Sequence, residues 1–444
     1  MFVELAYIYY IQTENYTMKS GAADEYVTKT PRSRELHERA TAVMPGGDTR
    51  SVTYHKPYPS YVLSASDCRI VTDDDAELID FLNNYTQSVL RHAPPAVVKL
   101  VTDRFGRENG VGAPTEDAVI LAERLVSRVP FIEQVRFGNS GAEATMNAIR
   151  TAMAYTGEET VLKIHGGYHG THHTVEVAVE DDGREHAGIP QDVERQIATV
   201  PFNDVDALKP RFERRGDEFA CFILEPLMGV AGAIPPELEL LETARDLTAD
   251  HEVPLIFDEV MTMRLAYGRA KERYGVTPDL TALGKFIGRR LPIEAFGGRE
   301  DIMNVFHPED GVAHHSGTFN ANPATMAGGI ATLDALDAVA IDQLNELGDR
   351  LRRKARTVVA SHNLDITVTG DSSMFQLHRA SGPVTDAESA AAETDAFAEL
   401  FLEMRNRRIF ITPRGIGNLS VPVDDAKINK FLAALNDSLA AIDG

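Results

Sequence analysis

The chain of 444 residues contains no tryptophan and only two cysteines, Cys68 and Cys221. Two isolated thiols argue against a disulfide framework and against a metal site built from cysteines, so a reducing, cytoplasmic location is predicted.

No run of about 18 apolar residues occurs, which argues against a transmembrane helix and a membrane partner. The short apolar stretch within residues 1–17 lacks the basic start and the cleavage site of a secretion signal, and we expect translation to start at Met18.

Positive charge is also scarce in this sequence. Lys and Arg number 44 against 67 Asp and Glu, which gives a formal net charge of −23, and only 11 of the basic residues are lysines. A surface this acidic repels phosphate backbones, so nucleic acid is not expected as a partner. A lysine-poor, acid-rich surface suits high salt, where its self-repulsion is screened, and predicts a halophilic protein.

The remaining composition is that of a globular protein, with 43% hydrophobic and 25% charged residues. Continuous apolar runs near residues 135–139, 220–226 and 253–260 alternate with helical patterns over 142–155 and 237–250. Apolar runs between helices are typical of buried parallel strands. The predicted fold class is therefore α/β, with a large central, mostly parallel sheet and a smaller α+β domain that is built from both chain ends.

The same pattern predicts the domain boundaries. We expect a disordered tail over residues 1–30 and a large domain over 96–330. The smaller domain is expected to combine residues 31–95 with residues 331–444.

A strand-to-helix turn at Ser140, Gly141 and Ala142 is the first candidate site. Ser140 and Glu143 have the spacing of a capping box, which explains the turn in purely structural terms. The free N–H groups and the positive end of a helix also attract a dianion, and small residues let a phosphate approach the backbone. The turn therefore predicts either a helix cap or a phosphate site.

Two charged residues stand within apolar segments. Asp258 ends an apolar run. If that run is a buried strand, its carboxylate lies at the edge of the sheet where α/β proteins bind ligands; the alternative is that Asp258 only caps a helix or forms a turn. Lys285 lies between Gly284 and Gly288. A lysine desolvated in such a setting has a lowered pKa and becomes an amine nucleophile, whereas a solvated lysine carries no chemistry.

Two further turns hold candidate residues. Three histidines cluster within residues 169–173, but no HExxH pattern or accompanying carboxylate is present, so a metal site is not predicted. In the same segment Tyr168 offers an aromatic surface beside the polar His169. The glycine-rich turn at Gly317 and Thr318 is either another phosphate contact or only a loop.

These features together are what pyridoxal 5′-phosphate requires of a protein. Lysine forms an imine with its aldehyde, a carboxylate keeps its ring nitrogen protonated, and a helix end holds its phosphate. The spacing of 27 positions from Asp258 to Lys285 allows the chain to leave a strand end and return to the same cleft. The sequence therefore predicts pyridoxal 5′-phosphate as the cofactor.

The motifs also resemble, in their order along the chain, those of the class III, fold type I aminotransferases. They are NSGAEATMNAIRTAMAYTG, KIHGGYHG, ILEPLMGVAG, LIFDEVMT, LGKFIG and SGTFNANP. Within that family the chain is most similar to the glutamate-1-semialdehyde aminomutase branch, from Pro45 to the C-terminal helix. The resemblance implies a fold type I enzyme and an obligate homodimer with shared active sites.

The resemblance also implies roles for single residues. Lys285 matches the lysine that binds the cofactor covalently and shuttles a proton, and Asp258 matches the partner of the ring nitrogen. The other cofactor-binding residues that it implies are Ser140, Gly141 and Ala142 at the phosphate, Tyr168, His169, Glu225 and Val260 around the ring, and Gly317 and Thr318 at the phosphate of the partner subunit.

Several positions depart from the aminomutase pattern. Val230 stands where aminomutases have the Asn of EPVAGN, and their PPSxxE is replaced by Thr412-Pro413-Arg414-Gly415. The PGGDTR segment and the late Arg414 resemble the β-amino-acid aminotransferases instead. Arg50 and Arg414 are therefore candidates for binding a substrate carboxylate, with surface arginines as the alternative.

Three functions remain open at this point. The leading prediction is an aminotransferase that moves an amino group from a carboxylate-bearing donor, β-amino acids included, to a keto acid, in ping-pong half-reactions through a Lys285 imine. The second is a glutamate-1-semialdehyde 2,1-aminomutase, which returns the amino group to the same carbon skeleton. The third is a catalytically silent binding protein, against which the intact Lys285 and Asp258 argue.

Overall fold

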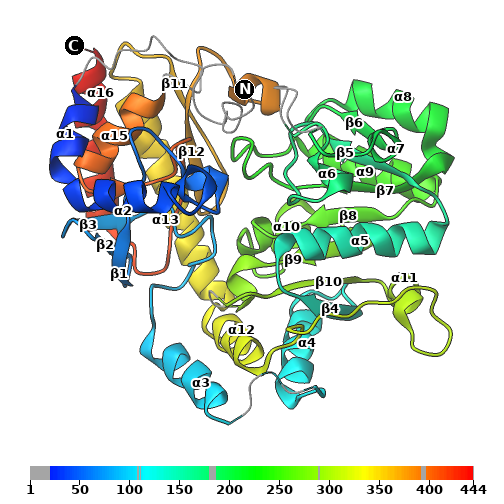
Figure 1. Cartoon of the computed structure of the whole chain (residues 1–444). Helices are drawn as coiled ribbons and strands as arrows, with labels where there is room; N and C mark the ends of the chain where they lie inside the picture. Colours follow the sequence, from blue (N-terminus) through cyan, green and yellow to red (C-terminus); the bar gives the residue numbers. More distant parts are fainter. Residues whose placement is uncertain are drawn as a thin grey trace.

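The computed structural model describes residues 21–107, 110, 112–179, 187–288, 291–391 and 397–443. Within these ranges the strands form three sheets. Figure 1 shows two lobes, a larger one built on the middle of the chain and a smaller one in which blue N-terminal and red C-terminal elements lie side by side. The start predicted at Met18 lies outside the described residues.

The larger lobe is built on a seven-stranded sheet. Its strands, in spatial order, are β4 (Gln134–Gly138), β10 (Glu294–Gly298), β9 (Leu280–Leu283), β8 (Leu255–Asp258), β7 (Phe219–Leu224), β5 (Thr160–Ile164) and β6 (Ile197–Val200). Strand β10 is antiparallel to both of its neighbours, and the other pairs are parallel. The prediction of a mostly parallel central sheet is confirmed.

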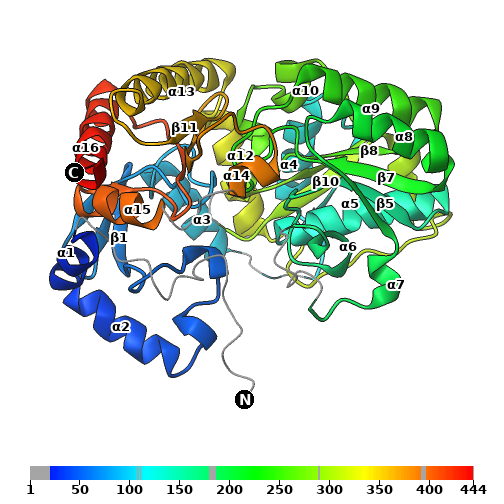
Figure 2. The same cartoon turned by 90° about the horizontal axis from the view of Figure 1, so that it is seen from above.

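Helices cover both faces of this sheet, which explains why its central strands are apolar throughout. Every residue of β7, β8 and β9 is buried. Helix α5 (Gly141–Thr156) lies on one face, with α8 (Val205–Arg215) and α9 (Leu238–Asp250) on the other (Figure 2). Short helices complete this lobe: α6 (His173–Glu176), α7 (Gln191–Glu194), α10 (Arg269–Tyr274) and α11 (Glu300–Met303).

Three further helices close one end of the larger lobe. Helix α12 (Pro323–Ala335) packs on α3 (Pro95–Phe105), on α4 (Glu116–Arg128) and on the short helical turn η5 (Lys285–Gly288). Gly329 allows the approach to η5, because a Cβ at this position would lie 2.3 Å from the Ile287 carbonyl oxygen. The boundary predicted at residue 330 falls inside α12.

Both chain ends contribute to the smaller lobe. One sheet joins β1 (Val62–Ser66), β2 (Arg69–Thr72), β3 (Glu77–Asp80) and β13 (Ile409–Phe410), and another joins β11 (Ile366–Thr369), β12 (Met374–Arg379) and β14 (Ile416–Asn418). Strand β13 pairs in parallel with β3 across more than 300 residues of sequence. The helices of this lobe are α1 (Ala22–Lys29), α2 (Pro31–Thr41), α13 (Ala338–Val359), α14 (Ala387–Ala391), α15 (Phe397–Asn406) and α16 (Asp425–Asp443).

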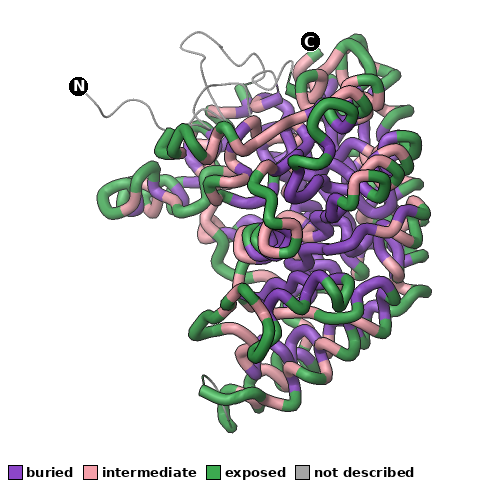
Figure 3. Tube along the Cα trace, turned by 90° about the vertical axis from the view of Figure 1, so that its right-hand side faces the viewer, coloured by how far each residue is buried: buried purple, intermediate pink, exposed green. Residues whose placement is uncertain are grey.

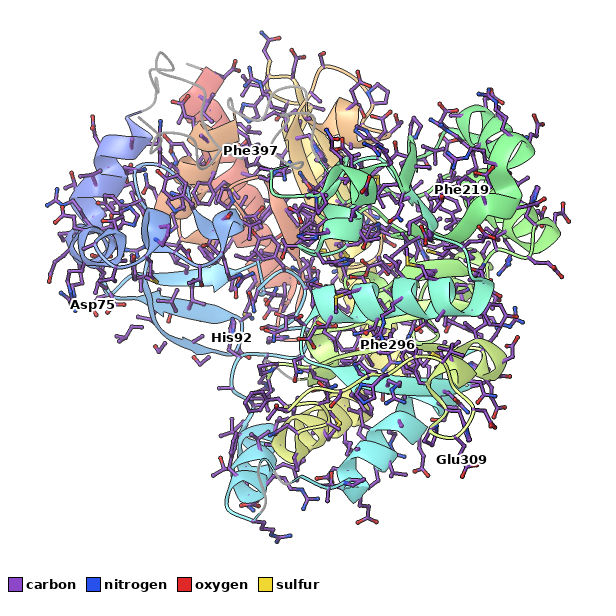
Figure 4. All side chains as sticks on the ribbon, turned by 45° about the vertical axis from the view of Figure 1, so that its right-hand side comes forward. Asp75, His92, Phe219, Phe296, Glu309 and Phe397 are labelled. Carbon is purple, nitrogen blue, oxygen red and sulfur yellow. The ribbon has the colours of Figure 1, made fainter. Side chains whose placement is uncertain are left out.

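Buried residues fill the interior of both lobes (Figure 3). Phe296, labelled in Figure 4, lies in a core cluster that also contains residues of α5. Its ring lies 5.7 Å from that of Phe306 in an edge-to-face arrangement. Burial of such a side chain stabilises the fold by about 1.5–3 kcal/mol. The sheet is therefore a rigid platform for the side chains at its strand ends.

A buried arginine connects the two lobes. Arg264 follows β8, and its side chain donates hydrogen bonds to Ser373 Oγ (2.9 Å), Asn418 Oδ1 (2.7 Å) and the Leu419 carbonyl oxygen. Burial lowers the pKa of Arg264 to about 9. Each buried N–H that is paired in this way avoids a desolvation penalty, so the bonds fix the smaller lobe relative to the end of β8.

The prediction that residues 1–30 form a disordered tail is wrong for residues 22–29. Residues 22–29 form α1, which packs against α15. Tyr26 is fully buried there, and its hydroxyl donates to the Tyr58 carbonyl oxygen at 2.9 Å and lies 2.8 Å from Ser60 Oγ. The partners of α1 are distant in sequence, so local composition gave no indication of this burial.

No single helix in the described part of the chain is long and apolar enough to cross a membrane. One pair of helices, α12 and α13, passes such a test together by length and composition only, and the two are bent by 73° relative to each other.

The hydroxyl of Tyr26 provides a test of how firmly α1 is anchored. Replacing Tyr26 by Phe keeps the ring but leaves the buried Tyr58 carbonyl without this donor, so we expect the free energy of unfolding to fall by about 1–2 kcal/mol. Urea unfolding followed by circular dichroism measures the change. The matched control Tyr155→Phe, at a 43% exposed tyrosine, is expected to change it by less than about 0.5 kcal/mol. Equal effects in both variants would contradict the anchoring of α1.

Candidate active site

A cavity of about 640 Å³ opens at the carboxyl ends of the central strands. Ligands bind at this edge in α/β proteins because the loops that follow the strands surround it. The cavity brings together ten of the residues predicted from the sequence: Arg50, Ser140, Gly141, Ala142, Tyr168, His169, Glu225, Asp258, Val260 and Lys285.

Three of the predicted site residues lie outside this cavity. Gly317 and Thr318 are exposed in the segment before α12, which is linked to the turn before α5 by a 2.7 Å hydrogen bond from Asn139 Nδ2 to Asn320 Oδ1. Arg414 lies in the turn before β14 and lines a separate small cavity beside β12. Their roles in binding stay predictions.

Asp258 is the last residue of β8 and is held by two hydrogen bonds. Its Oδ2 lies 2.9 Å from Nδ1 of the buried His169, and its Oδ1 accepts from the Val260 N–H at 3.1 Å. Burial lowers the pKa of His169 below its usual value. The imidazole is therefore neutral, and Nδ1 carries the proton that it donates to the carboxylate. This bond fixes the orientation of Asp258 toward the cavity.

Lys285 is the first residue of η5, and only Gly284 separates it from the end of β9. Its backbone has φ 54°, in the left-handed region that costs energy for a residue other than glycine. Burial lowers the pKa of its amine from the usual value, while the carboxylates of Glu294, Asp258 and Glu225 oppose this lowering. The result is an amine that reaches its neutral, nucleophilic form more readily than a surface lysine does.

The turn before α5 forms the predicted helix cap. Ser140 is the N-cap residue, and its Oγ accepts from the Glu143 N–H at 3.3 Å. The Glu143 carboxylate reaches back to the Asn139 N–H at 2.8 Å instead of to Ser140. The loop at Gly170 lies against this helix end so closely that a Cβ there would be 2.6 Å from Ala142 Cα. The first N–H groups of α5 face the cavity and can hold an anion there.

Two residues offer surfaces for an aromatic ring. Val260 packs beside Gly141, where a Cβ would lie 3.4 Å from Val260 Cγ1, and Tyr168 is 36% exposed at the cavity wall. Glu225 holds the Tyr168 loop by accepting from the Tyr168 N–H at 3.1 Å and from the Gly229 N–H at 3.0 Å. Burial and the nearby Asp258 charge raise the pKa of Glu225 to about 8.

Arg50 forms the outer wall of the cavity. Its Nη1 donates to Asn84 Oδ1 at 2.7 Å, and its guanidinium lies 5.5 Å from the centre of the Tyr85 ring. Arg50, Asn84 and Tyr85 also line a second cavity of about 630 Å³, formed by the N-terminal part of the smaller lobe. The two cavities are therefore neighbours that share this wall.

The sequence analysis missed Glu294, a buried carboxylate in the same cavity. Its Oε1 accepts from the Lys285 N–H at 3.2 Å. Burial raises the pKa of Glu294 to about 8, against the opposing effect of the Lys285 charge. A signal was present in the sequence, since Glu294 stands between apolar residues in the segment 291–296, much as Asp258 ends an apolar run.

The residues of this cavity fit pyridoxal 5′-phosphate. A buried amine, a carboxylate oriented by a neutral histidine, and a helix N-terminus lined by small residues are the three groups that its aldehyde, ring nitrogen and phosphate require. Among the described residues, no group of three or more His, Cys, Asp or Glu side chains is arranged to hold a metal ion.

Comparison with known proteins supports the same interpretation. The family model described as "Aminotransferase class-III" matches residues 51–394, well over half of the chain. The chain is similar to the glutamate-1-semialdehyde 2,1-aminomutase of Methanocaldococcus jannaschii, with 38% identity over 94% of this chain and 99% of that protein.

Two solved structures are also similar. An omega-transaminase from Sphaerobacter thermophilus has 37% identity and a TM-score of 0.90, over 94% of this chain and 100% of that one. A beta-phenylalanine aminotransferase from Variovorax paradoxus has 32% identity and a TM-score of 0.89, over 95% and 96%.

The predicted α/β, fold type I architecture is confirmed, and so is the prediction of a class III aminotransferase-type enzyme. The predicted cofactor, pyridoxal 5′-phosphate, is confirmed at the level of the family. The match to the family model and the identity to relatives over nearly the whole chain leave no other assignment. This chain belongs to the class III aminotransferase family.

Proposed function

We propose that this protein is an aminotransferase that moves an amino group from a carboxylate-bearing amino donor to a keto acid, with pyridoxal 5′-phosphate as its cofactor. When bound, this cofactor supplies an aldehyde that condenses with amines and a ring that accepts electrons from a breaking C–H bond. The protein's own residues bind it, orient it and move the proton.

Lys285 and Asp258 carry the chemistry in this proposal. The neutral Lys285 amine is the group that would bond to the cofactor, and once free it would take the proton from the substrate carbon next to nitrogen. Asp258, oriented by His169, would pair with the ring nitrogen. The first N–H groups of α5 would hold the phosphate.

The observation that carries the proposal is the position of Arg50 on the wall of the cavity that holds Lys285. A guanidinium there can bind a substrate carboxylate through two parallel hydrogen bonds. Its side chain is braced by Asn84 and Tyr85. Such bracing lowers the entropy lost when a substrate binds. A β-amino acid is one of the donors that fit this arrangement, in line with the names of the solved transaminases.

A glutamate-1-semialdehyde 2,1-aminomutase is the second candidate, favoured by the names of the curated relatives. The residue at the aminomutase Asn position is Val230, and it lines the cavity with an apolar side chain. An apolar group cannot replace the hydrogen bonds of an amide. This difference favours transfer between two molecules over transfer within one.

We further propose a cytoplasmic, halophilic homodimer in which each subunit completes the other's site. The exposed Gly317 and Thr318 support the dimer, as does Phe319, whose side chain is 67% exposed. A large exposed aromatic beside a glycine-rich turn is more common at interfaces than on free surfaces. The net charge of −23 supports the salt requirement.

Removing the amine tests the chemistry. In Lys285→Ala, we expect turnover to fall by at least about hundredfold, the typical minimum for loss of a general base, and the visible absorbance of covalently bound cofactor to disappear. Absorbance spectra and steady-state kinetics of the purified protein at high salt measure both. The control Lys354→Ala removes an exposed lysine on α13 and is expected to leave both unchanged. Near wild-type turnover in Lys285→Ala would refute the proposed chemistry.

The need for a second substrate separates the two candidate functions. An aminotransferase converts the donor to its keto product in a single turnover and continues only when a keto acid is added. Initial rates at varied donor and acceptor concentrations are expected to give the parallel double-reciprocal lines of ping-pong kinetics. Sustained turnover of glutamate-1-semialdehyde without any keto acid would favour the aminomutase instead.

Arg50 is tested by its effect on substrate binding. In Arg50→Ala, we expect KM for a carboxylate-bearing donor to rise about tenfold to hundredfold, which corresponds to a lost charge-assisted hydrogen bond. KM for a donor amine that lacks the carboxylate is expected to stay the same. Arg414→Ala is measured in parallel for comparison, because Arg414 is the other predicted carboxylate-binding arginine but lines a different cavity. An unchanged KM in Arg50→Ala would remove Arg50 from the substrate site.

A further inference from the structure

Glu294 is a buried carboxylate in the cavity that contains Lys285. It is the first residue of β10 and pairs in register with Gly138 of β4, just before the phosphate turn. A carboxylate beside an anion-binding turn is unfavourable unless a cation or a proton neutralises it.

The Glu294 carboxylate lies directly against the backbone that carries Lys285. Oε1 accepts from the Lys285 N–H at 3.2 Å. A Cβ on Gly284 would fall 1.5 Å from Oε2, so the carboxylate fills the space that any other residue at 284 would need. Oε2 itself is buried and has no hydrogen-bond partner among the described residues. A buried oxygen left in this state requires a donor.

Lys285 is the group that can supply this donor. Among the charged groups that act on Glu294, Lys285 is the cation, whereas Asp258 on β8 and Glu143 on α5 are carboxylates. We propose that Glu294 is the counter-ion of the Lys285 ammonium, and thereby a positioning residue that sets the pH at which Lys285 is a free amine.

One proton is shared by the two groups. When Lys285 is released and takes up a proton, the ammonium is held by the Glu294 carboxylate. When the amine must attack, Nζ passes a proton to Oε2, which leaves a neutral amine and a neutral carboxylic acid. Both forms of the pair have zero net charge, so neither leaves an uncompensated charge in the buried site. The other charged groups that face this pair are Asp258, Glu225, Glu143 and Arg50.

This inference rests on the proposed function only in taking Lys285 as the amine that bonds to the cofactor. The test compares the wild-type protein with Glu294→Gln, which keeps an oxygen to accept from the Lys285 N–H but cannot ionise. Cofactor is removed from both proteins, and the rate at which each captures added pyridoxal 5′-phosphate is followed by absorbance between about pH 6 and 10. Capture requires the neutral amine, so the midpoint of the rate profile reports the pKa of Lys285.

We expect the midpoint to move to lower pH by about one unit or more in Glu294→Gln, because the ammonium loses its opposite charge. Glu346→Gln, at an exposed glutamate on α13, is the matched control and is expected to keep the wild-type midpoint. Circular dichroism confirms that each variant is folded. A Glu294→Gln midpoint equal to the wild-type value would overturn the proposal.

A second measurement avoids the cofactor altogether. Cyanate reacts with neutral amines, and peptide mass spectrometry gives the extent of carbamylation at Lys285 against pH, with the exposed Lys354 as the internal standard. The Lys285 profile is expected to shift to lower pH in Glu294→Gln while the Lys354 profile stays in place. Failure of the wild-type protein to capture cofactor would overturn the proposed function, whereas identical Lys285 profiles in the two proteins would overturn the role of Glu294 alone.

Discussion

The burial of one amine among carboxylates is the constraint on which this structure depends. Desolvation lowers the pKa of Lys285, and the charges around it restore part of that loss. Burial also raises the pKa of Glu225 and of Glu294 to about 8. Asp258 lies in the same cavity, where His169 and the Val260 N–H hold its two carboxylate oxygens. A raised pKa reduces the negative charge that these two glutamates add to the cavity, which favours an anion there within a protein of net charge −23.

The fold supplies this arrangement through neighbouring strand ends. Parallel strands β7 and β8 deliver Glu225 and Asp258 to one edge, and the antiparallel β10 begins at that same edge with Glu294. Lys285 reaches it from η5, which α12 supports from behind through the close approach at Gly329. Because α12 is packed on α3 and α4 as well, the position of the amine depends on elements that are far apart in sequence. Such support is what holds a strained backbone at a reactive residue.

The sequence predicted the parts of this structure that are local. The Ser140 cap, the apolar strand that ends at Asp258 and the helix over 142–155 each follow from spacing within a few residues, and α5 extends that helix by only one residue at each end. What it missed depends on how the folded chain brings particular residues together. Tyr26 is buried by Tyr58 and Ser60, and Glu294 matters because β10 brings it to Lys285. Neither partner can be identified from composition or period.

The division between the lobes separates chemistry from recognition. Lys285, Asp258, His169 and Glu294 all come from the larger lobe, whereas Arg50 and its supports Asn84 and Tyr85 come from the N-terminal part of the smaller lobe. The wall that these three residues form faces two cavities at once. Substitutions in that wall can change the shape and charge of the cavity without moving Lys285 or Glu294, which come from the other lobe. Relatives of this chain carry the names of both aminomutases and transaminases. Because the wall comes from a different lobe than Lys285, it is where we expect residues that distinguish such activities to differ.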